Sequence, residues 1–279
     1  MRLVVAGIAV MDYVHRMDAL PTRGTKYRSH GFDRIGGGCA ANAAVGAARL
    51  GAEVTLVSRF GADPTGDELA AMLQAHGVTL AVARGGQTPL SSVMVDAQGE
   101  RMIVNYRGAD LPQTPPPTPA FDAVLADCRW PAATDAVLRA AKAAGRPAVI
   151  DGERDTSPVL AALATHVVFS ADGLRDFTGM DALPAALQDA TARLPGDVAY
   201  TDGPDGVRWG SGLHVPAPKV AAIDTLGAGD LWHGAFTFAL AAGSGLDVAS
   251  DFANRAAAMK CSRAGGWEVY PTEAELEDP

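Results

Sequence analysis

The chain has 279 residues, of which 48% are hydrophobic and 20% charged, proportions that are ordinary for one large globular domain with a substantial core. Its 32 acidic residues outnumber 23 basic ones, which gives a net charge of -9 at pH 7, and no run of lysine or arginine stands out. This balance argues against nucleic acid and anionic membranes as partners, so we expect neither.

The cysteines Cys39, Cys128 and Cys261 are widely scattered, without the paired spacing of a zinc site or a disulfide framework. Unpaired cysteines of this kind are typical of a reducing compartment. The apolar N-terminal run is too short for a membrane span and lacks a cleavage site after a long apolar core. We therefore expect a cytoplasmic protein.

A near-continuous aliphatic run from Leu3 to Val10 predicts a first strand that is central in a parallel sheet and buried on both faces. The run ends at Asp12. Ligands of open α/β sheets gather at the carboxyl ends of such strands, so Asp12 is placed where a substrate could bind. A strand-ending turn residue is the plainer interpretation of the same aspartate.

Two segments, about 12–35 and 88–108, show no helical period and predict short strands of a half-exposed sheet. The second has the pattern of a hairpin from Ser91 to Tyr106 that turns at 97–99. Together the segments would form a small four-stranded sheet, which we expect to pack as a lid over one face of the main domain.

Three glycines at 36–38 lead into an alanine-rich segment that ends at Gly51. This pattern predicts a loop with close access to its backbone, followed by a tightly packed helix. Asn42 would lie one turn into that helix. A short amide is a poor helix former there, which points to a polar role.

Strand-like and helix-like segments alternate over the rest of the chain. We predict strands over 53–59, 123–126, 148–151, 167–170, 198–201 and 206–215, and helices over 64–77, 132–144, 160–163, 183–194 and 248–262. The alternation predicts a single α/β domain over 1–279, with a mostly parallel sheet that is covered by helices on both faces.

The stretch Asp224-Thr-Leu-Gly-Ala-Gly-Asp230 precedes an apolar run of helical spacing. Backbone N–H groups of 227–230 would point outward from the positive end of the helix dipole, where a phosphate could approach closely. A carboxylate would repel that phosphate unless it had a separate task, and general base fits: Asp230 would accept the proton of an attacking hydroxyl. An N-cap aspartate and two turn glycines would give the same pattern.

These seven residues resemble the C-terminal signature of the ribokinase-like (PfkB-type) sugar kinases. The resemblance implies that Asp230 is the base and that the preceding amides form an anion hole, namely those of Gly227, Ala228 and Gly229. It extends over the whole chain, because the first strand, a first glycine signature, two lid insertions and this last signature occur in the expected order. It also implies a ribokinase-like fold with a small β-sheet lid.

The sugar site is implied by the first signature, in which Gly37 and Gly38 are followed by Asn42, and by Asp12 as a ligand of sugar hydroxyls. A carboxylate, exposed amides and a side-chain amide can hold a polyol through directional hydrogen bonds.

Arg129, at the end of a predicted strand, and Asn105, on the lid hairpin, are further candidates for the sugar site. A guanidinium and an amide suit an anionic sulfonate or the far hydroxyls of an open ketose. A surface salt bridge would explain Arg129 equally well.

An ATP site is also implied by the resemblance, because a Gly-x-x-Gly loop lies beside ATP in the family. The residues assigned in this way are Thr201, Gly203, Gly206, Thr225, Ala253, Asn254 and Ala257, with the last three as the adenine wall. An ordinary turn would explain the two glycines as well.

The cation sites depart from the family pattern. Many members carry Asn-x-x-Glu near the magnesium waters, where this chain has only Asp172. We expect Mg²⁺ to rest mainly on the ATP phosphates, with Asp172, Asp151 or Glu153 reaching it through water, although solvated surface carboxylates are the plainer interpretation. The Asp224 carbonyl and the 263–266 loop match the family's monovalent-cation site in position, which makes K⁺ a further candidate.

Local stretches such as Gly-Ile-Ala-Val-Met-Asp12 and Lys260-Cys-Ser-Arg-Ala-Gly-Gly look closest to the ketohexokinase and sulfofructose kinase branch. We therefore predict an ATP-dependent kinase that phosphorylates a primary hydroxyl of a ketohexose-type sugar, such as fructose or sulfofructose. Asn42 departs from the sulfofructose kinase pattern, which has a smaller hydroxyl residue there. A ribokinase or nucleoside kinase of the same fold and a sugar-binding sensor without turnover are the alternatives. A homodimer through the lid is also expected.

Overall fold

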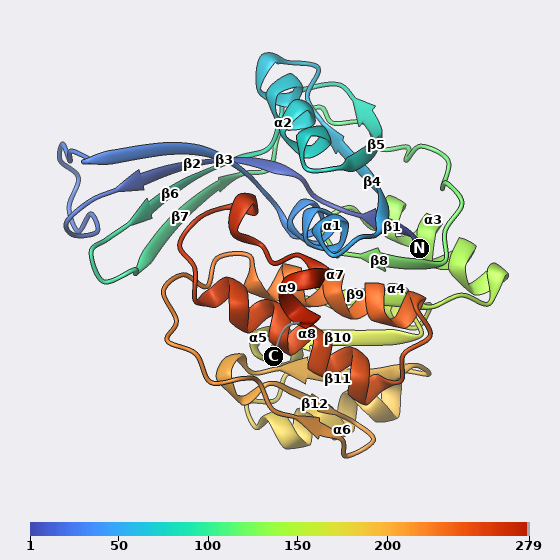
Figure 1. Ribbon diagram of the computed structural model, residues 1–279. Helices are drawn as coiled ribbons and strands as arrows, with labels where there is room; N and C mark the ends of the chain where they lie inside the picture. The colour runs from blue at the N-terminus through green and yellow to red at the C-terminus, as the bar shows by residue number, and fades with distance from the viewer. Residues whose placement is uncertain (278–279) are drawn as a thin grey trace.

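The computed structural model describes residues 1–277, and its main sheet has nine strands (Figure 1). Their spatial order is β13 (His214–Val215), β12 (Val207–Trp209), β11 (Asp197–Thr201), β10 (His166–Ser170), β9 (Ala148–Gly152), β8 (Ala123–Ala126), β1 (Arg2–Ala6), β4 (Glu53–Phe60) and β5 (Val78–Arg84). The seven neighbouring strands β11, β10, β9, β8, β1, β4 and β5 pair in parallel, whereas β12 pairs antiparallel with both β11 and β13. The mostly parallel sheet predicted from the sequence is therefore confirmed.

Helices cover both faces of this sheet, as its alternating side chains require (Figure 1). Leu3 and Val5 of β1 face one core, and Val4 and Ala6 face the other. The first core is closed by α1 (Cys39–Arg49), α2 (Pro64–Ala75), α7 (Ala228–Ala241), α8 (Leu246–Cys261) and α9 (Glu273–Glu277), and the second by α3 (Pro131–Ala144), α4 (Pro158–Ala161), α5 (Ala171–Thr178) and α6 (Leu183–Arg193).

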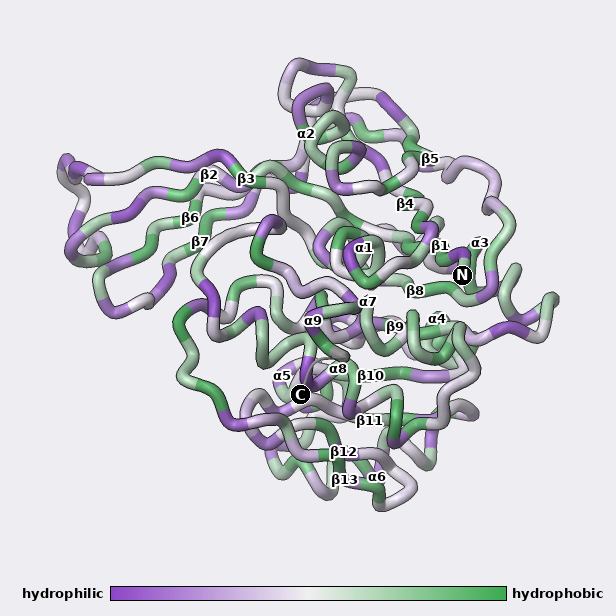
Figure 2. Tube along the Cα trace, viewed as in Figure 1, coloured by the Kyte–Doolittle hydropathy of each residue, from purple (hydrophilic) through white to green (hydrophobic). Residues whose placement is uncertain are grey.

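The hydropathy of the chain follows these layers, since apolar segments concentrate in the strands and helices of the main domain (Figure 2). Helix α7 is the clearest case: eleven of its residues are buried, between α1, α8 and the sheet. Within residues 1–277, no helix is both long and apolar enough to cross a bilayer.

A second sheet projects from the main domain (Figure 1). Its order is β3 (Gly31–Gly37), β2 (Val10–Arg16), β6 (Leu90–Val95) and β7 (Arg101–Tyr106). The pairs β2–β3 and β6–β7 are antiparallel, whereas β2 and β6 run parallel. This is the small sheet expected from segments 12–35 and 88–108, and we call it the lid sheet.

The prediction for the first strand is wrong in one respect. The aliphatic run is interrupted at Gly7, which has a φ of 150°, and is divided between β1 and β2. A Cβ at Gly7 would lie 2.1 Å from the carboxylate of Asp127, so the chain turns where only glycine fits. Asp12 consequently lies in the lid sheet instead of at the end of a main-sheet strand.

Candidate active site

The N-terminus of α7 is built on a glycine that no other residue can replace without strain. Gly227 has a φ of 73°, and a Cβ there would lie 2.4 Å from the hydroxyl of Tyr270. The Ala228 N–H donates weakly to the carbonyl of Thr225, at 3.3 Å. Within residues 1–277, the N–H groups of Gly229 and Asp230 donate to no protein acceptor, and a Cβ at Gly229 would meet no atom within 4 Å. This helix start therefore offers amides to an anion.

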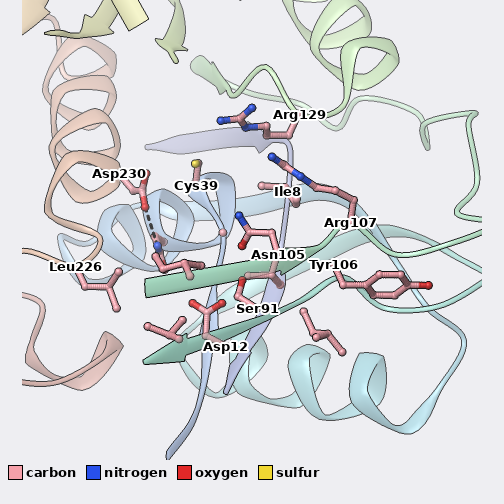
Figure 3. Close-up of a pocket in the computed structure, with 16 residues that line it drawn as sticks. Ile8, Asp12, Cys39, Ser91, Asn105, Tyr106, Arg107, Arg129, Leu226 and Asp230 are labelled. Atoms are coloured by element: carbon pink, nitrogen blue, oxygen red, sulfur yellow. Dashed lines mark hydrogen bonds between the residues drawn. The ribbon is translucent and has the colours of Figure 1, made fainter. Parts of the chain in front are cut away.

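Asp230 is held from the opposite side by Asn42 of α1. The Asn42 Nδ2 donates to Asp230 Oδ2 at 2.7 Å, the bond drawn as a dashed line at Asp230 in Figure 3. Asn42 Oδ1 accepts from Trp267 Nε1, also at 2.7 Å. Trp267 thus fixes which end of the amide faces Asp230. The sequence predicted that Asn42 contacts a sugar, whereas in the structure it also donates to Asp230. The second N–H of its amide could still donate to a bound sugar.

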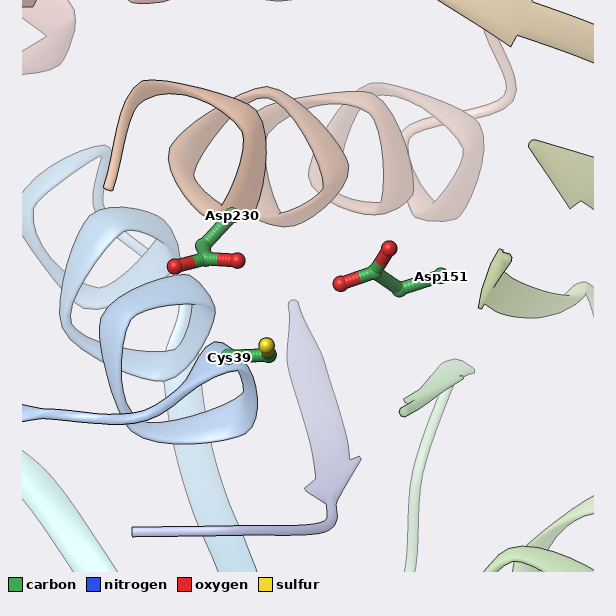
Figure 4. A group of neighbouring side chains, drawn as sticks. All are labelled: Cys39, Asp151 and Asp230. Atoms are coloured by element: carbon green, nitrogen blue, oxygen red, sulfur yellow. The ribbon is translucent and has the colours of Figure 1, made fainter. Parts of the chain in front are cut away.

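Cys39 and Asp151 lie beside Asp230, which gives three potential ligand groups in one cluster (Figure 4). Atoms of Cys39, Asp151 and Asp230 all lie within 4.8 Å of one another. Burial and the charge of nearby Asp151 raise the pKa of Asp230 to about 7, against the opposing donation from Asn42. The base proposed from the sequence is therefore half protonated near neutral pH, where a general base is effective.

Asp151 is the penultimate residue of β9 and is 4% exposed. Its Oδ1 lies 3.6 Å from Nε2 of His233 on α7. Burial raises the pKa of Asp151 well above its ordinary value, and the neighbouring charges of Glu153 and Asp127 add to this effect. Burial thus favours the neutral form of Asp151, and a cation beside it would stabilise the ionised form.

Asp127, which follows β8, was missed by the sequence reasoning. Its carboxylate accepts backbone N–H groups from Ile8 at 2.8 Å, Arg129 at 2.8 Å and Ala40 at 3.3 Å. It therefore ties the ends of β1 and β8 to the start of α1. The only signal in the sequence was an acid directly after a predicted strand, which is too common to single it out.

A cavity of about 220 Å³ lies between the lid sheet and the strand ends (Figure 3). Among the sequence-predicted residues, it is lined by Asp12, Gly38, Asn42, Asn105, Arg129 and Asp230. One cross-strand row of the lid sheet, Ile35–Asp12–Ser91–Asn105, carries the polar groups that face it. Gly37 does not line the cavity. A Cβ there would lie 2.1 Å from Asp12 Oδ2, so Gly37 leaves room for that carboxylate.

Burial raises the pKa of Asp12 to about 6, and a hydrogen bond with Ser91 limits the shift. Asp12 is 9% exposed, so its remaining surface is turned to the cavity that it lines. It is placed to accept hydrogen bonds from hydroxyls of a bound polyol.

A larger cavity, of about 810 Å³, lies on the other side of the α7 N-terminus. It is lined by six of the seven residues assigned to ATP: Thr201, Gly203, Gly206, Thr225, Asn254 and Ala257. Ala253 is fully buried in the core and does not line it, because this turn of α8 faces inward. Gly229 and Ala228 line this cavity while Asp230 lines the smaller one. The helix start therefore separates two chambers.

Asp172 is not placed beside the acidic cluster. Its carboxylate binds Arg154 at 3.2 Å and Arg175 at 3.0 Å, and it lines neither cavity. Two arginines already neutralise it, so the structure does not support its expected contact with magnesium waters. Asp151 and Glu153, at the end of β9, are better placed.

The expected monovalent-cation site already contains a protein ammonium group. Lys260 is fully buried, and its Nζ lies 3.0 Å from both the carbonyl oxygen and Oδ2 of Asp224. Arg101 of the lid sheet binds Oδ1 at 2.7 Å, and Leu226 N–H donates to the same oxygen. Burial would raise the pKa of Asp224, but these partners outweigh it and hold the pKa below its ordinary value.

Comparison with known proteins gives a consistent result. The sequence model described as "pfkB family carbohydrate kinase" matches residues 1–273. Ribokinase of Bacillus subtilis is 30% identical over 290 residues, 99% of this chain and 98% of that protein. Fructokinase of Klebsiella pneumoniae is 31% identical over 237 residues, 74% of this chain and 76% of that protein.

Solved structures agree in fold. A proposed ribokinase from Agrobacterium tumefaciens superimposes with a TM-score of 0.93 at 33% identity, covering 99% of this chain and 96% of that one. Ribokinase of Arabidopsis thaliana, solved with ribose and ATP, superimposes with a TM-score of 0.86 at 24% identity, covering 99% of this chain and 97% of that one.

Proposed function

The chain belongs to the pfkB family of carbohydrate kinases and is an ATP-dependent carbohydrate kinase, and from this premise we propose that it phosphorylates a primary hydroxyl of a sugar bound beneath the lid sheet. The observation that carries this proposal is the division of the site by the start of α7, with Asp230 on the sugar side and the amides of Ala228 and Gly229 on the nucleotide side. A phosphoryl group that passes from ATP to the sugar at the start of α7 would lie between the backbone N–H donors on the nucleotide side and Asp230 on the sugar side.

The chemistry follows from that geometry. The sugar oxygen attacks the γ-phosphorus of ATP, the bond between this phosphorus and the β–γ bridging oxygen breaks, and ADP leaves. Asp230 accepts the proton of the attacking hydroxyl, and Asn42 holds the carboxylate in place. Backbone amides of 227–229 stabilise the charge on the transferred group.

Magnesium accompanies ATP in this proposal. It neutralises charge on the phosphates, which supply most of its ligands. Asp151 and Glu153 are the residues that fit a contact through water, since Asp151 is buried and His233 is its one close basic partner among the described residues.

For the acceptor, we propose a monosaccharide of five or six carbons. The cavity of about 220 Å³ is small, and Asp12, Ser91 and Asn105 offer hydrogen bonds along one wall. The ketohexose-type acceptor is supported by the sequence stretches described above and by the fructokinase relative, and ribose is supported at least as well by the ribokinase relative. A nucleoside is less well supported, since Tyr106 is the only aromatic side chain of the described residues that lines this cavity.

The test is ADP release with a panel of fructose, ribose, a sulfonated ketose and adenosine. We expect turnover of at least one sugar, and we expect Asp230→Asn to lower kcat by about 1,000-fold or more while ATP binding, followed by calorimetry, is nearly unchanged. Gly229→Ala, a change on the nucleotide side, is the matched variant that retains the base. Equal turnover by the wild type and Asp230→Asn would remove Asp230 as the base.

Two further parts of the proposal concern cations and assembly. Because Lys260 occupies the position expected for K⁺, we propose that its ammonium group supplies the positive charge beside the anion site. We also propose a homodimer through the outer face of the lid sheet, where Phe32, Met102 and Val104 are exposed. A cytoplasmic location is proposed from the three free cysteines.

A further inference from the structure

A second cavity, of about 420 Å³, adjoins the sugar cavity. The two share Ile8, Arg107 and Arg129 as lining residues, and the second also contacts Arg59. Figure 3 shows the side chains of Arg107 and Arg129 beside Ile8, with Leu226 at the opposite side of the view. Three guanidinium groups from separate parts of the chain therefore converge on one extension of the sugar site.

None of these three guanidinium groups has a carboxylate of residues 1–276 within 4.0 Å, whereas Arg84 and Arg101 are paired with Asp67 and Asp224. Three unpaired arginines at one cavity are unexpected in a chain with a net charge of -9. They create a local positive potential of the kind that concentrates anionic ligands.

The contacts of Arg59 show that its positive charge is held without a carboxylate partner. Arg59 lies over the ring of Trp130, at 5.0 Å from its centroid, and donates to the carbonyl of Pro112. Burial lowers the pKa of Arg59, so its charge lies where it is poorly compensated. A bound anion would supply the missing compensation.

A plainer role for Arg129 would be to offset the acids beside the base. The backbone N–H of Arg129 makes the contact with Asp127. Burial raises the pKa of Asp127 and Asp151, and the charge of the Arg129 guanidinium limits this rise without forming an ion pair with either carboxylate. Asp155 also lines the second cavity, yet it lies beyond 4.0 Å from all three guanidinium nitrogens. Arg129 therefore partly offsets the acids beside the base, while Arg59 and Arg107 have no ion-pair partner among the carboxylates of residues 1–276 and keep this end of the cavity basic.

We infer that the acceptor sugar carries an anionic group, a phosphate, sulfonate or carboxylate, remote from the hydroxyl that is phosphorylated, and that Arg107 and Arg129 bind it. This inference rests on the proposed function, because it identifies the substrate class of the same site. Guanidinium groups match such oxyanions through paired N–H donors, with Arg59 adding charge from behind.

The positions of the two arginines add a mechanical consequence. Arg107 follows β7 of the lid sheet, whereas Arg129 follows β8 of the main sheet. An anion held by both would connect the lid to the main domain. Binding of the charged end would then favour the lid position that shields Asp230 from water.

The experiment compares neutral sugars with anionic partners that keep a free primary hydroxyl. Fructose is tested against fructose 6-phosphate and 6-sulfonated fructose, ribose against ribose 1-phosphate, and a six-carbon sugar acid serves as the carboxylate; these arms distinguish the sources of the anion. We expect kcat/KM for one anionic sugar to exceed that of its neutral partner by about 10-fold or more, since hydrogen bonds to charged groups contribute about 1.5–3 kcal/mol each.

Arg107→Gln and Arg129→Gln should each reduce this preference by about 10-fold or more, mainly through KM, and Arg107→Lys should restore part of it. Arg208→Gln on β12, an exposed arginine that lines neither cavity, is the matched control and should leave the preference unchanged.

Two outcomes would overturn the inference while leaving the proposed function intact: a preference for the neutral sugar, or a preference for the anionic sugar that Arg107→Gln and Arg129→Gln do not alter. If no sugar is turned over, the proposed function fails instead, and thermal stabilisation decides the inference. Stabilisation by a phosphorylated sugar that is lost in Arg107→Gln would support the anion site, and its absence would refute it.

Discussion

The carboxyl group of Asp230 combines a reactive position with an unusual proton affinity. Burial and Asp151 bring its pKa to about 7, which is far above the ordinary value of 3.8. Only the ionised form can accept a proton, and that form increases as the pH rises through 7. A residue poised in this way converts a small change of pH into a change of rate.

We therefore expect kcat to rise with pH along a limb whose apparent pKa is near 7. Below this value Asp230 is protonated and cannot act as the base. Steady-state rates between pH 5.5 and 9, at saturating ATP and sugar, measure the limb. Asp12, with a pKa of about 6, should affect KM for the sugar more than kcat. A rate that is flat between pH 6 and 8 would contradict the assignment.

Asn42 offers a second test at the residue scale. Its N–H donation lowers the pKa of Asp230, so Asn42→Leu should raise that pKa and move the acid limb to higher pH. At pH 7 we expect about a 10-fold loss of kcat, with partial recovery at pH 9. The pH profile measures this shift.

Trp267→Phe is the matched control for Asn42→Leu, since it removes the bond that orients Asn42 but keeps the amide. A smaller shift in the same direction is expected. A uniform loss of activity at all pH values in Asn42→Leu would indicate a purely structural role.

The element that organises the site is the first turn of α7. A left-handed glycine starts the helix, and the next residues present amides to one chamber and a carboxylate to the other. The α1 helix, with its own start fixed by Asp127, supplies Asn42 from the opposite side. The N-terminal turns of two helices thus meet at Asp230.

Gly227→Ala should destabilise the protein and reduce turnover. Its φ of 73° is strained for alanine, and the new Cβ would collide with the hydroxyl of Tyr270. We expect a loss of about 1–3 kcal/mol in the free energy of unfolding, measured in urea. Gly229→Ala, where a Cβ meets no atom within 4 Å, is the control and should keep or slightly raise stability. Equal stability of both variants would show that the turn tolerates a side chain.

Because Lys260, near the end of α8, already supplies a positive charge, we expect turnover to be independent of K⁺. Its ammonium already binds the carbonyl oxygen of Asp224, which was expected to contact the cation, and it also binds Oδ2 of the same residue. We expect kcat to differ by less than about twofold between KCl and tetramethylammonium chloride, because electrostatic stabilisation comes from a fixed charge.

The variant Lys260→Met should lower kcat and make it respond to K⁺. Lys142→Met, on α3 and distant from the site, controls for loss of a lysine. Strong K⁺ activation of the wild type would refute the proposed substitution of the ion by Lys260.

At the scale of the whole molecule, the lid sheet has two different faces. Asp12, Ser91 and Asn105 share the face toward the sugar, and the opposite face carries Phe32 and Val104, which are 52% and 60% exposed. An exposed apolar face on a projecting sheet is costly in water and favours association with a second copy.

We expect the wild type to sediment as a dimer and Val104→Glu to shift it toward the monomer, because a charge in an apolar interface remains unpaired. Sedimentation velocity over a range of concentrations measures this. Val159→Glu, on the exposed surface of α4, is the matched control and should leave the oligomer unchanged. A monomeric wild type, or a dimer unaffected by Val104→Glu, would refute the lid interface.

The sequence by itself determined the alternation of strands and helices, the small second sheet, the family, and the loop at 227–230, because periodicity and glycine placement act over short distances along the chain. Several local features were missed even so. The strand β5 and helix α5 were not predicted, and the run from Leu3 to Val10 concealed a turn at Gly7 that depends on the distant Asp127.

Tertiary structure alone decided which groups meet. Asn42 and Asp230 are 188 residues apart, Lys260 on α8 meets Asp224 in the loop before α7, and the arginines at 59, 107 and 129 lie in or just after three separate strands. Asp172 forms ion pairs with two arginines outside the site, and Ala253 lies in the core. These outcomes depend on how distant segments of the chain come together. They also depend on burial, which raises the pKa values of Asp12 and Asp230. Local spacing along the sequence reveals neither the contacts nor the burial.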